Sequence, residues 1–238
     1  MNTLLLTPEE AAGARDGRVR LADDRRVAHV RTVHRAAAGA VVNAGVLGGR
    51  LGTARVVTLD EGGLELDLTL DREPPPPVPL VLVLALPRPK VVRRVLQAVT
   101  TLGVKRLALV AAWRVEKSYW ESPLLADAAV HAELVLGLEQ AGDTMLPTVS
   151  LHRLFKPFVE DELPALAAET RRLVAHPNAA SACPRAVREP VTLAIGPEGG
   201  FTEYELGKLG AEGFAAVSLG PRVLRVEQAV SALVGRLF

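Results

Sequence analysis

The sequence lacks several features that would assign it quickly to a class of protein. It contains one cysteine, Cys183, which excludes an internal disulfide and fits a reducing compartment. Aromatic residues make up only 4% of the chain, so the core must consist mainly of Val, Leu and Ala. No apolar run is long enough to span a membrane, and residues 1–8 lack the basic start and cleavage site of a secretion signal. We therefore expect a cytoplasmic protein.

Common catalytic and cofactor motifs are also missing. Residues 45–52 are rich in glycine but do not match G-x-G-x-x-G, and hairpin turns explain them better. No G-x-x-x-x-G-K-[ST] loop and no Ser nucleophile elbow is present. The histidines have no metal-ligand spacing with one another or with Cys183, so we expect no metal. These absences disfavour hydrolases and metalloenzymes.

What the sequence does have is a segregated distribution of charge. The formal net charge is only +1, yet residues 25–59 hold Arg and no acid, and residues 74–115 hold Arg and Lys and again no acid. Charge segregated in this way can present a positive face to a polyanion, and the planar fork of arginine suits phosphate. The alternative is a set of solvated faces that never meet in space.

A proline-rich segment, residues 73–79, divides two kinds of pattern. Residues 1–72 contain short β-type segments at 40–42, 45–50, 53–59 and 64–70, which predict a small β-barrel. Residues 80–238 alternate apolar strand patterns (80–86, 106–112, 172–176) with helical patterns (90–102, 121–141). This alternation predicts an α/β domain with a parallel sheet.

Two glycine-proline turns near the end of the chain stand out. Each follows an apolar run of strand type, at Gly196-Pro197 and at Gly220-Pro221, and precedes a helical pattern. After the first turn, Thr202 and Glu205 form a capping-box pattern, which predicts that a helix starts there. Turns without side-chain bulk indicate a backbone that closely approaches a ligand or another stretch of chain.

The amino-acid sequence around these two turns resembles that of a known family. Residues 195–205 (IGPEGGFTEYE) and 217–229 (VSLGPRVLRVEQA) are similar to the ribosomal RNA small subunit methyltransferase E family of SPOUT-class enzymes. The resemblance implies a SPOUT α/β domain with a deep trefoil knot, an N-terminal PUA-like barrel, S-adenosylmethionine as cofactor and a homodimer. It further implies methylation of N3 of a uridine in 16S rRNA, at the position usually counted as 1498, within the 30S subunit. The stretch from His29 to His34 and Arg35 fits the family signature imperfectly.

The resemblance also suggests roles for individual residues. The catalytic candidates are Arg225 first, then Arg222 and Glu227, because a cation beside the base would stabilise negative charge as the N3 proton leaves. The candidate phosphate contacts in the barrel are Arg25, Arg26, Arg31 and Arg35. The expected cofactor-binding residues surround the two turns: Ile195, Gly196, Pro197, Gly199, Gly200, Leu219, Gly220 and Leu224.

The chain departs from the family pattern beside Arg225. Val226 and Gln228 stand where the family commonly has threonine. Three other functions therefore stay open: a SPOUT enzyme acting on another RNA such as tRNA, a non-catalytic RNA-binding or ribosome-assembly factor, and a metabolic α/β enzyme with a barrel appendage. The segregated arginines disfavour the last.

Overall fold

The computed structural model describes residues 2–22, 24–33 and 35–238, which form two compact units. The first comprises residues 1–76 and 135–146, and the second comprises residues 77–134 and 147–238. The change from one unit to the other falls inside the proline-rich segment. The return of residues 135–146 to the first unit was not indicated by the sequence.

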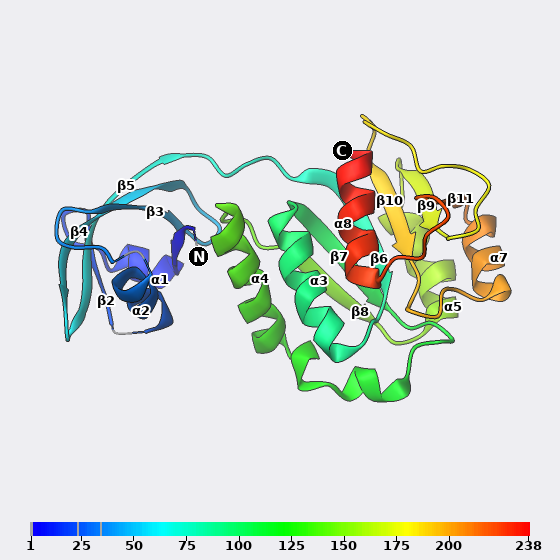
Figure 1. Ribbon diagram of the computed structural model, residues 1–238, viewed down its shortest axis with the longest axis horizontal. Coiled ribbons are helices and arrows are strands. Elements are labelled where there is room, and N and C mark those ends of the chain that lie inside the picture. Colours follow the sequence, from blue (N-terminus) through cyan, green and yellow to red (C-terminus); the bar gives the residue numbers. More distant parts are fainter. Residues whose placement is uncertain (1, 23, 34) are drawn as a thin grey trace. The chain divides into compact units, whose positions relative to one another are not determined.

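The first unit is built on a five-stranded sheet that curls into a half-barrel (Figure 1). In spatial order the strands are β1 (Leu4–Leu6), β3 (Val41–Val46), β4 (Leu51–Asp60), β5 (Gly63–Arg72) and β2 (Arg18–Leu21). β1 runs parallel to β3, and the other pairs are antiparallel. Of the segments predicted between residues 45 and 70, the first overlaps the end of β3, the second lies in β4 and the third lies in β5. β1 and β2 were not predicted.

Two short helices accompany this sheet, and neither was predicted. α1 (Pro8–Ala12) starts at a capping box in which Thr7 and Glu10 hydrogen-bond to each other's backbone. α2 (Arg25–Thr32) is capped by Asp24 and buries Val27 and Val30 in the core of the unit. His34, which belongs to the imperfect family signature, lies outside the described residues.

The second unit contains a six-stranded sheet in which all strands are parallel, as the alternating pattern predicted. In spatial order its strands are β11 (Ala215–Val217), β9 (Arg171–Ala175), β10 (Val191–Ile195), β6 (Val78–Ala85), β7 (Val104–Val110) and β8 (Thr148–His152). The uniformly apolar β6 lies in the middle and is buried on both faces, which is the usual environment of such a run. β8 was not predicted.

The helices of this unit include α3 (Pro89–Thr101), which agrees with the predicted helix at 90–102. The predicted helical region at 121–141 holds a short 3-10 helix, η2 (Pro123–Leu125), followed by α4 (Asp127–Ala141), whose C-terminal part belongs to the first unit. The remaining helices are η1 (Lys117–Glu121), α5 (Phe155–Pro157), η3 (Phe158–Glu162), α6 (Leu163–Leu166), α7 (Glu203–Ala211) and α8 (Val226–Leu237). Among the residues that the structure describes, we find no helix with the length and apolar character needed to cross a membrane.

The order of the strands determines where a ligand can bind. β10 lies between β6 and β9, although both of these precede it in the sequence. The registers pair Ile195 with Ala175, and Val217 with Ala175, so β9, β10 and β11 end side by side. In open parallel sheets, ligands bind outside the carboxyl ends of the strands, and both glycine-proline turns leave the sheet at this edge.

Candidate functional site

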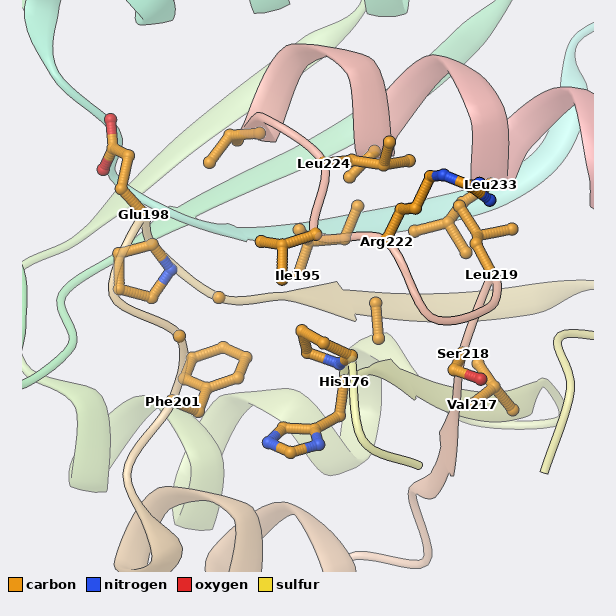
Figure 2. Close-up of a pocket in the computed structure, with 18 of the residues that line it drawn as sticks. His176, Ile195, Glu198, Phe201, Val217, Ser218, Leu219, Arg222, Leu224 and Leu233 are labelled. Atoms are coloured by element: carbon orange, nitrogen blue, oxygen red, sulfur yellow. The ribbon is translucent and has the colours of Figure 1, made fainter. Parts of the chain in front are cut away.

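A cavity of about 730 Å³, its open mouth included, lies at the carboxyl ends of β9, β10 and β11 (Figure 2). Both glycine-proline turns and the start of α8 contribute to its wall. The lining residues are Ala175, His176, Pro177, Ile195, Gly196, Pro197, Glu198, Gly200, Phe201, Val217, Ser218, Leu219, Gly220, Arg222, Val223, Leu224, Val226, Ala229 and Leu233.

The first turn is tightly closed, and its glycines are required by its geometry. The backbone N–H of Gly200 donates to the carbonyl of Pro197 at 2.8 Å, with Gly200 at a φ of +74° that favours glycine. A Cβ on Gly196 would lie 2.9 Å from the backbone nitrogen of Phe201, closer than side chains pack. Arg114 donates to the carbonyl of Gly199 from outside the turn. The absence of a side chain at Gly196 thus lets the chain fold back on itself at the cavity wall.

The turn is continued by the predicted helix, α7, whose capping box is present. The Thr202 hydroxyl accepts from the backbone N–H of Glu205 at 3.3 Å, and Glu205 Oε2 accepts from the backbone N–H of Thr202 at 2.8 Å. Glu205 is only 3% exposed, and its Oε1 accepts from the backbone N–H of Trp113 at 2.7 Å. This carboxylate therefore anchors the segment after β7 to the first turn.

The second turn is held by a separate stretch of chain. Ser218 donates its backbone N–H to the carbonyl of Ser181 and accepts at its own carbonyl from the N–H of Cys183, at 2.9 and 2.8 Å. Gly220 has a φ of +116°, a conformation that other residues rarely adopt. Gln228 Oε1 accepts from the backbone N–H of Arg225 at 3.3 Å, so Gln228 caps the start of α8.

The walls of the cavity are mostly apolar, with few polar side chains at its rim. In Figure 2, His176 and Phe201 lie on one side, and Leu219, Leu224 and Leu233 lie on the other. Glu198 accepts from the backbone N–H of Arg88 at 3.3 Å and lies 3.5 Å from its Nε, which compensates the carboxylate charge. An apolar slot with backbone exposed at its glycines suits a flat aromatic group bound to a short polar chain.

The predicted cofactor residues gather around this cavity. Ile195, Gly196, Pro197, Gly200, Leu219, Gly220 and Leu224 line it, whereas Gly199 does not and instead lies against Arg114. The sequence reasoning missed the wall formed by Ala175, His176 and Pro177, which follows β9. Its position depends on the pairing of β9 with both β10 and β11, and no local motif marks it.

The three catalytic candidates differ in their surroundings. Arg222 lines the cavity, and Arg225 is exposed between the lining residues Leu224 and Val226. Within the described parts of the chain, neither guanidinium has a carboxylate partner. Glu227 differs, since its Oε1 lies 3.4 Å from Nη1 of Arg94 on α3. Glu227 therefore takes part in an ion pair between α3 and α8.

The arginines predicted to contact phosphate are only partly available. Arg26 is largely buried, and its Nη2 lies 2.6 Å from both Glu10 and Asp24, so its assignment as a phosphate contact is replaced by a structural one. The hydrogen bond from Arg26 lowers the pKa of Glu10, and the same bond raises the pKa of Arg26. Arg25 makes a two-pronged bond to the buried Glu139 at 2.7 and 2.9 Å. Arg31 and Arg35 are exposed, although Arg31 donates to the carbonyl of Asp60.

The described residues include no cluster of side chains that could hold a metal ion. Over residues 2–22, 24–33 and 35–238, no group of three or more His, Cys, Asp or Glu side chains is placed to hold an ion. The glycine-bounded cavity is thus the strongest candidate for a functional site.

The chain is similar to known RNA methyltransferases. A family model described as RNA methyltransferase domain matches residues 74–237. Ribosomal RNA small subunit methyltransferase E of Treponema pallidum is 34% identical over 214 residues, which cover 88% of this chain and 80% of that protein.

Two solved structures share the fold of this chain over 98% of its length. The first is ribosomal RNA small subunit methyltransferase E from Neisseria gonorrhoeae bound to S-adenosyl methionine, with a TM-score of 0.74 and 24% identity over 98% of this chain and 95% of that chain. The second is a methyltransferase from Legionella pneumophila in complex with the same cofactor, with a TM-score of 0.71 and 23% identity over 98% of this chain and 95% of that chain. By its match to the family model and to the Treponema protein, the chain belongs to the RNA methyltransferase family that contains the ribosomal RNA small subunit methyltransferases E.

Proposed function

We propose that the chain transfers a methyl group from S-adenosylmethionine to N3 of a uridine in 16S rRNA, at the position usually counted as 1498. The observation that carries this proposal is the apolar, glycine-bounded cavity with arginines at its rim, in a chain 34% identical to a ribosomal RNA small subunit methyltransferase E. The related structures with S-adenosylmethionine bound support the choice of cofactor.

The residues of the cavity fit this cofactor. Ile195, Leu219 and Leu224 provide apolar surface for an adenine ring, and the absence of a Cβ at Gly196 lets the turn that bounds the cavity close tightly. When bound, S-adenosylmethionine supplies an electrophilic methyl group on a sulfonium centre. The protein's task is then to orient the acceptor nitrogen in line with that group.

Arg222 and Arg225 have the charge that the reaction needs. Loss of the N3 proton of uracil to solvent leaves negative charge across the base and its two carbonyl oxygens until the N3–methyl bond forms. A guanidinium beside these oxygens stabilises that charge without having to reorganise. Arg222 lies at the rim of the cavity, and Arg225 directly follows the lining residue Leu224. Neither guanidinium is paired with a described carboxylate.

Glu227 is better suited to position α8 than to accept the N3 proton. Its ion pair with Arg94 joins the first turn of α8 to α3, and α3 and α8 are packed against each other. Glu227 is also not among the residues that line the cavity. We assign the proton to solvent at the cavity mouth and give Glu227 a positioning role.

The remaining expectations concern partners and topology. We propose that the half-barrel unit, as a PUA-like domain spanning residues 1–72, contacts rRNA phosphates through Arg31 and Arg35, and that the cytoplasmic enzyme acts on the 30S subunit as a homodimer. We also propose a trefoil knot in the domain of residues 80–238. Its support is the insertion of β10 between β6 and β9, together with hydrogen bonds that join the 181–187 segment to Ser218 and to α8.

Nucleoside analysis of 16S rRNA tests the proposal directly. We expect 3-methyluridine in rRNA from cells that carry the gene, its loss after deletion and its return with the wild-type gene. Calorimetry with S-adenosylmethionine separates the alternatives: a protein that binds no cofactor would be an assembly factor. An unchanged 16S profile with a methylated nucleoside missing from tRNA would identify a different RNA target.

A further inference from the structure

A second groove, of about 870 Å³ with its open mouth included, lies beside the first turn and is separate from the cofactor cavity. It is lined by Trp113, Phe155, Lys156, Thr202, Tyr204 and Glu205, all in the second unit. None of these residues lines the cofactor cavity, and the proposed methyl transfer uses none of them. The groove nevertheless shares the Gly196–Thr202 turn with that cavity, since Phe201 lines the cavity and Thr202 lines the groove.

Trp113 is the most unusual residue of the groove. Its side chain is 83% exposed, whereas Trp120, the other tryptophan, is 9% exposed. The backbone beneath the exposed ring is fixed, because the Trp113 N–H donates to the buried carboxylate of Glu205 at 2.7 Å. A large aromatic ring displayed to solvent from an anchored backbone is typical of a contact surface, since it contributes little to the core.

Two further aromatic rings line the groove. Tyr204, in the first turn of α7, is 59% exposed, and the Lys208 ammonium lies 5.8 Å from its ring centroid. Phe155, in α5, packs against Phe201 with ring centroids 6.0 Å apart. Phe155 therefore connects the groove to Phe201, a buried ring that lines the wall of the cofactor cavity.

The charges around these rings favour a polyanion. Lys156 lines the groove with an exposed side chain, and Arg114 lies on the neighbouring Gly199 carbonyl. The acid in the groove, Glu205, is occupied by the N–H groups of Trp113 and Thr202 and by the Thr202 hydroxyl. Glu160 lies 4.0 Å from the Lys156 ammonium and 2.6 Å from the Lys208 ammonium, so its closer ion pair is with Lys208.

We infer that Trp113 and Tyr204 stack an unpaired base of the RNA substrate that flanks the target uridine, while Lys156 faces its phosphate. This inference rests on the proposed function, because it names a subsite for the same substrate. Aromatic side chains with interspersed cations bind single-stranded RNA in this way, since every base has a face to stack. The shared turn places this subsite next to the position where the target base must meet the cofactor.

The test compares three substitutions at Trp113 with a matched exposed control, Leu151→Ala. We would measure binding to a single-stranded, uridine-containing oligoribonucleotide and to 30S subunits from a strain lacking the gene, and titrate S-adenosylmethionine by calorimetry. Trp113→Ala and Trp113→Leu should each weaken RNA binding by at least about fivefold, the lower end of what one stacked base contributes. Trp113→Phe should retain most of the affinity, because it keeps a flat ring. Cofactor affinity should be unchanged in all variants.

Fluorescence gives an independent readout of stacking. RNA should quench the tryptophan emission of the wild-type protein, and this quenching should disappear in Trp113→Phe, which retains the buried Trp120. In methylation assays, Trp113→Ala should raise KM for 30S subunits more than it lowers kcat. Tyr204→Ala should weaken RNA binding in the same direction.

Several outcomes would overturn the stacking subsite. Wild-type RNA affinity in Trp113→Ala, or in Trp113→Leu, would show that no ring is needed there. Unchanged RNA binding together with altered sedimentation would identify a protein as the occupant. If the wild-type protein methylates 30S subunits while Trp113→Ala binds RNA with unchanged affinity, the stacking subsite is wrong but the proposed function stands. If the wild-type protein binds cofactor but neither binds nor methylates RNA, the proposed function fails with it.

Discussion

The buried carboxylate of Glu205 accepts the backbone N–H of Trp113 at 2.7 Å, although the two residues are far apart in the sequence. Its other oxygen accepts the N–H and hydroxyl of Thr202. One side chain thus fixes the turn that bounds the cofactor cavity and the segment that displays the exposed tryptophan. The two sites that we propose on the methyltransferase unit share this support.

Glu205→Gln should destabilise the protein and loosen the first turn. The amide group can accept at only one atom, so one of the N–H groups now bound loses its partner. The free energy of unfolding should fall by about 1–3 kcal/mol in urea titrations. Glu203→Gln, in the same helical turn but exposed, serves as the control and should change the unfolding free energy by less than about 0.5 kcal/mol. Equal effects of the two substitutions would contradict the anchoring role.

Gly196→Ala should weaken binding of S-adenosylmethionine. The added Cβ would lie 2.9 Å from the nitrogen of Phe201, so the turn must open to accommodate it. Strain of this kind corresponds to a rise in Kd of about 5- to 150-fold, measured by calorimetry. Gly210→Ala in α7, where an added Cβ meets nothing within 4 Å, should leave the Kd unchanged and stabilise the helix slightly. Normal binding by Gly196→Ala would show that the turn does not contact the ligand.

Arg225→Ala should abolish methylation while folding and cofactor binding persist. Removal of one group that stabilises developing charge lowers kcat by about 100-fold or more. The assay is methyl transfer to 30S subunits, with calorimetry to confirm that S-adenosylmethionine still binds. Near-normal turnover would remove Arg225 from the reaction and leave Arg222 as the candidate.

Glu227→Gln provides the matched comparison, because it removes the charge of a residue only two positions after Arg225. If the ion pair with Arg94 is its role, turnover should change less than Arg225→Ala changes it, and Arg94→Ala should reproduce the effect. A loss of activity as large as that of Arg225→Ala, absent from Arg94→Ala, would identify Glu227 as the proton acceptor.

The first unit should lose stability in acid through Glu10. The Arg26 hydrogen bond holds the pKa of Glu10 below its ordinary value of 4.5 in the folded state. The pair therefore stabilises the fold above about pH 4.5, and this contribution disappears as the pH falls through the folded-state pKa. Urea midpoints should fall more steeply with acidification in the wild type than in Glu10→Gln. The exposed Glu61→Gln should behave like the wild type, and a parallel fall in Glu10→Gln would contradict the pair's role.

Binding to RNA should weaken as salt rises, because cations of the protein displace counterions from phosphate. Arg31→Ala and Arg35→Ala should each reduce the slope of log K against log salt by about 0.7 to 1. Fluorescence anisotropy at several salt concentrations measures the slope. Slopes unchanged by both substitutions would exclude these two arginines from the RNA contact.

The sequence predicted the parts of this structure whose signals are local. The apolar pattern of β6, the helix at Pro89–Thr101 and the Thr202–Glu205 capping box each depend on residues close together in the chain. The wall at His176 and Pro177 was missed because it reaches the cavity only through the pairing of β9 with β10 and β11. The ion pairs of Arg26 were missed for a similar reason. The acid-free stretch was counted from residue 25, so it did not include Asp24 or the more distant Glu10, which are the partners of Arg26.

The place of β10 in the sheet also has a consequence for synthesis on the ribosome. While the chain is emerging, β6 and β9 present unpaired edges to each other, and the gap closes only when residues 191–195 arrive. Exposed strand edges invite pairing with other chains. The cavity is completed later still, because its lining includes residues up to Leu233, so it cannot form before that part of the chain has been synthesised.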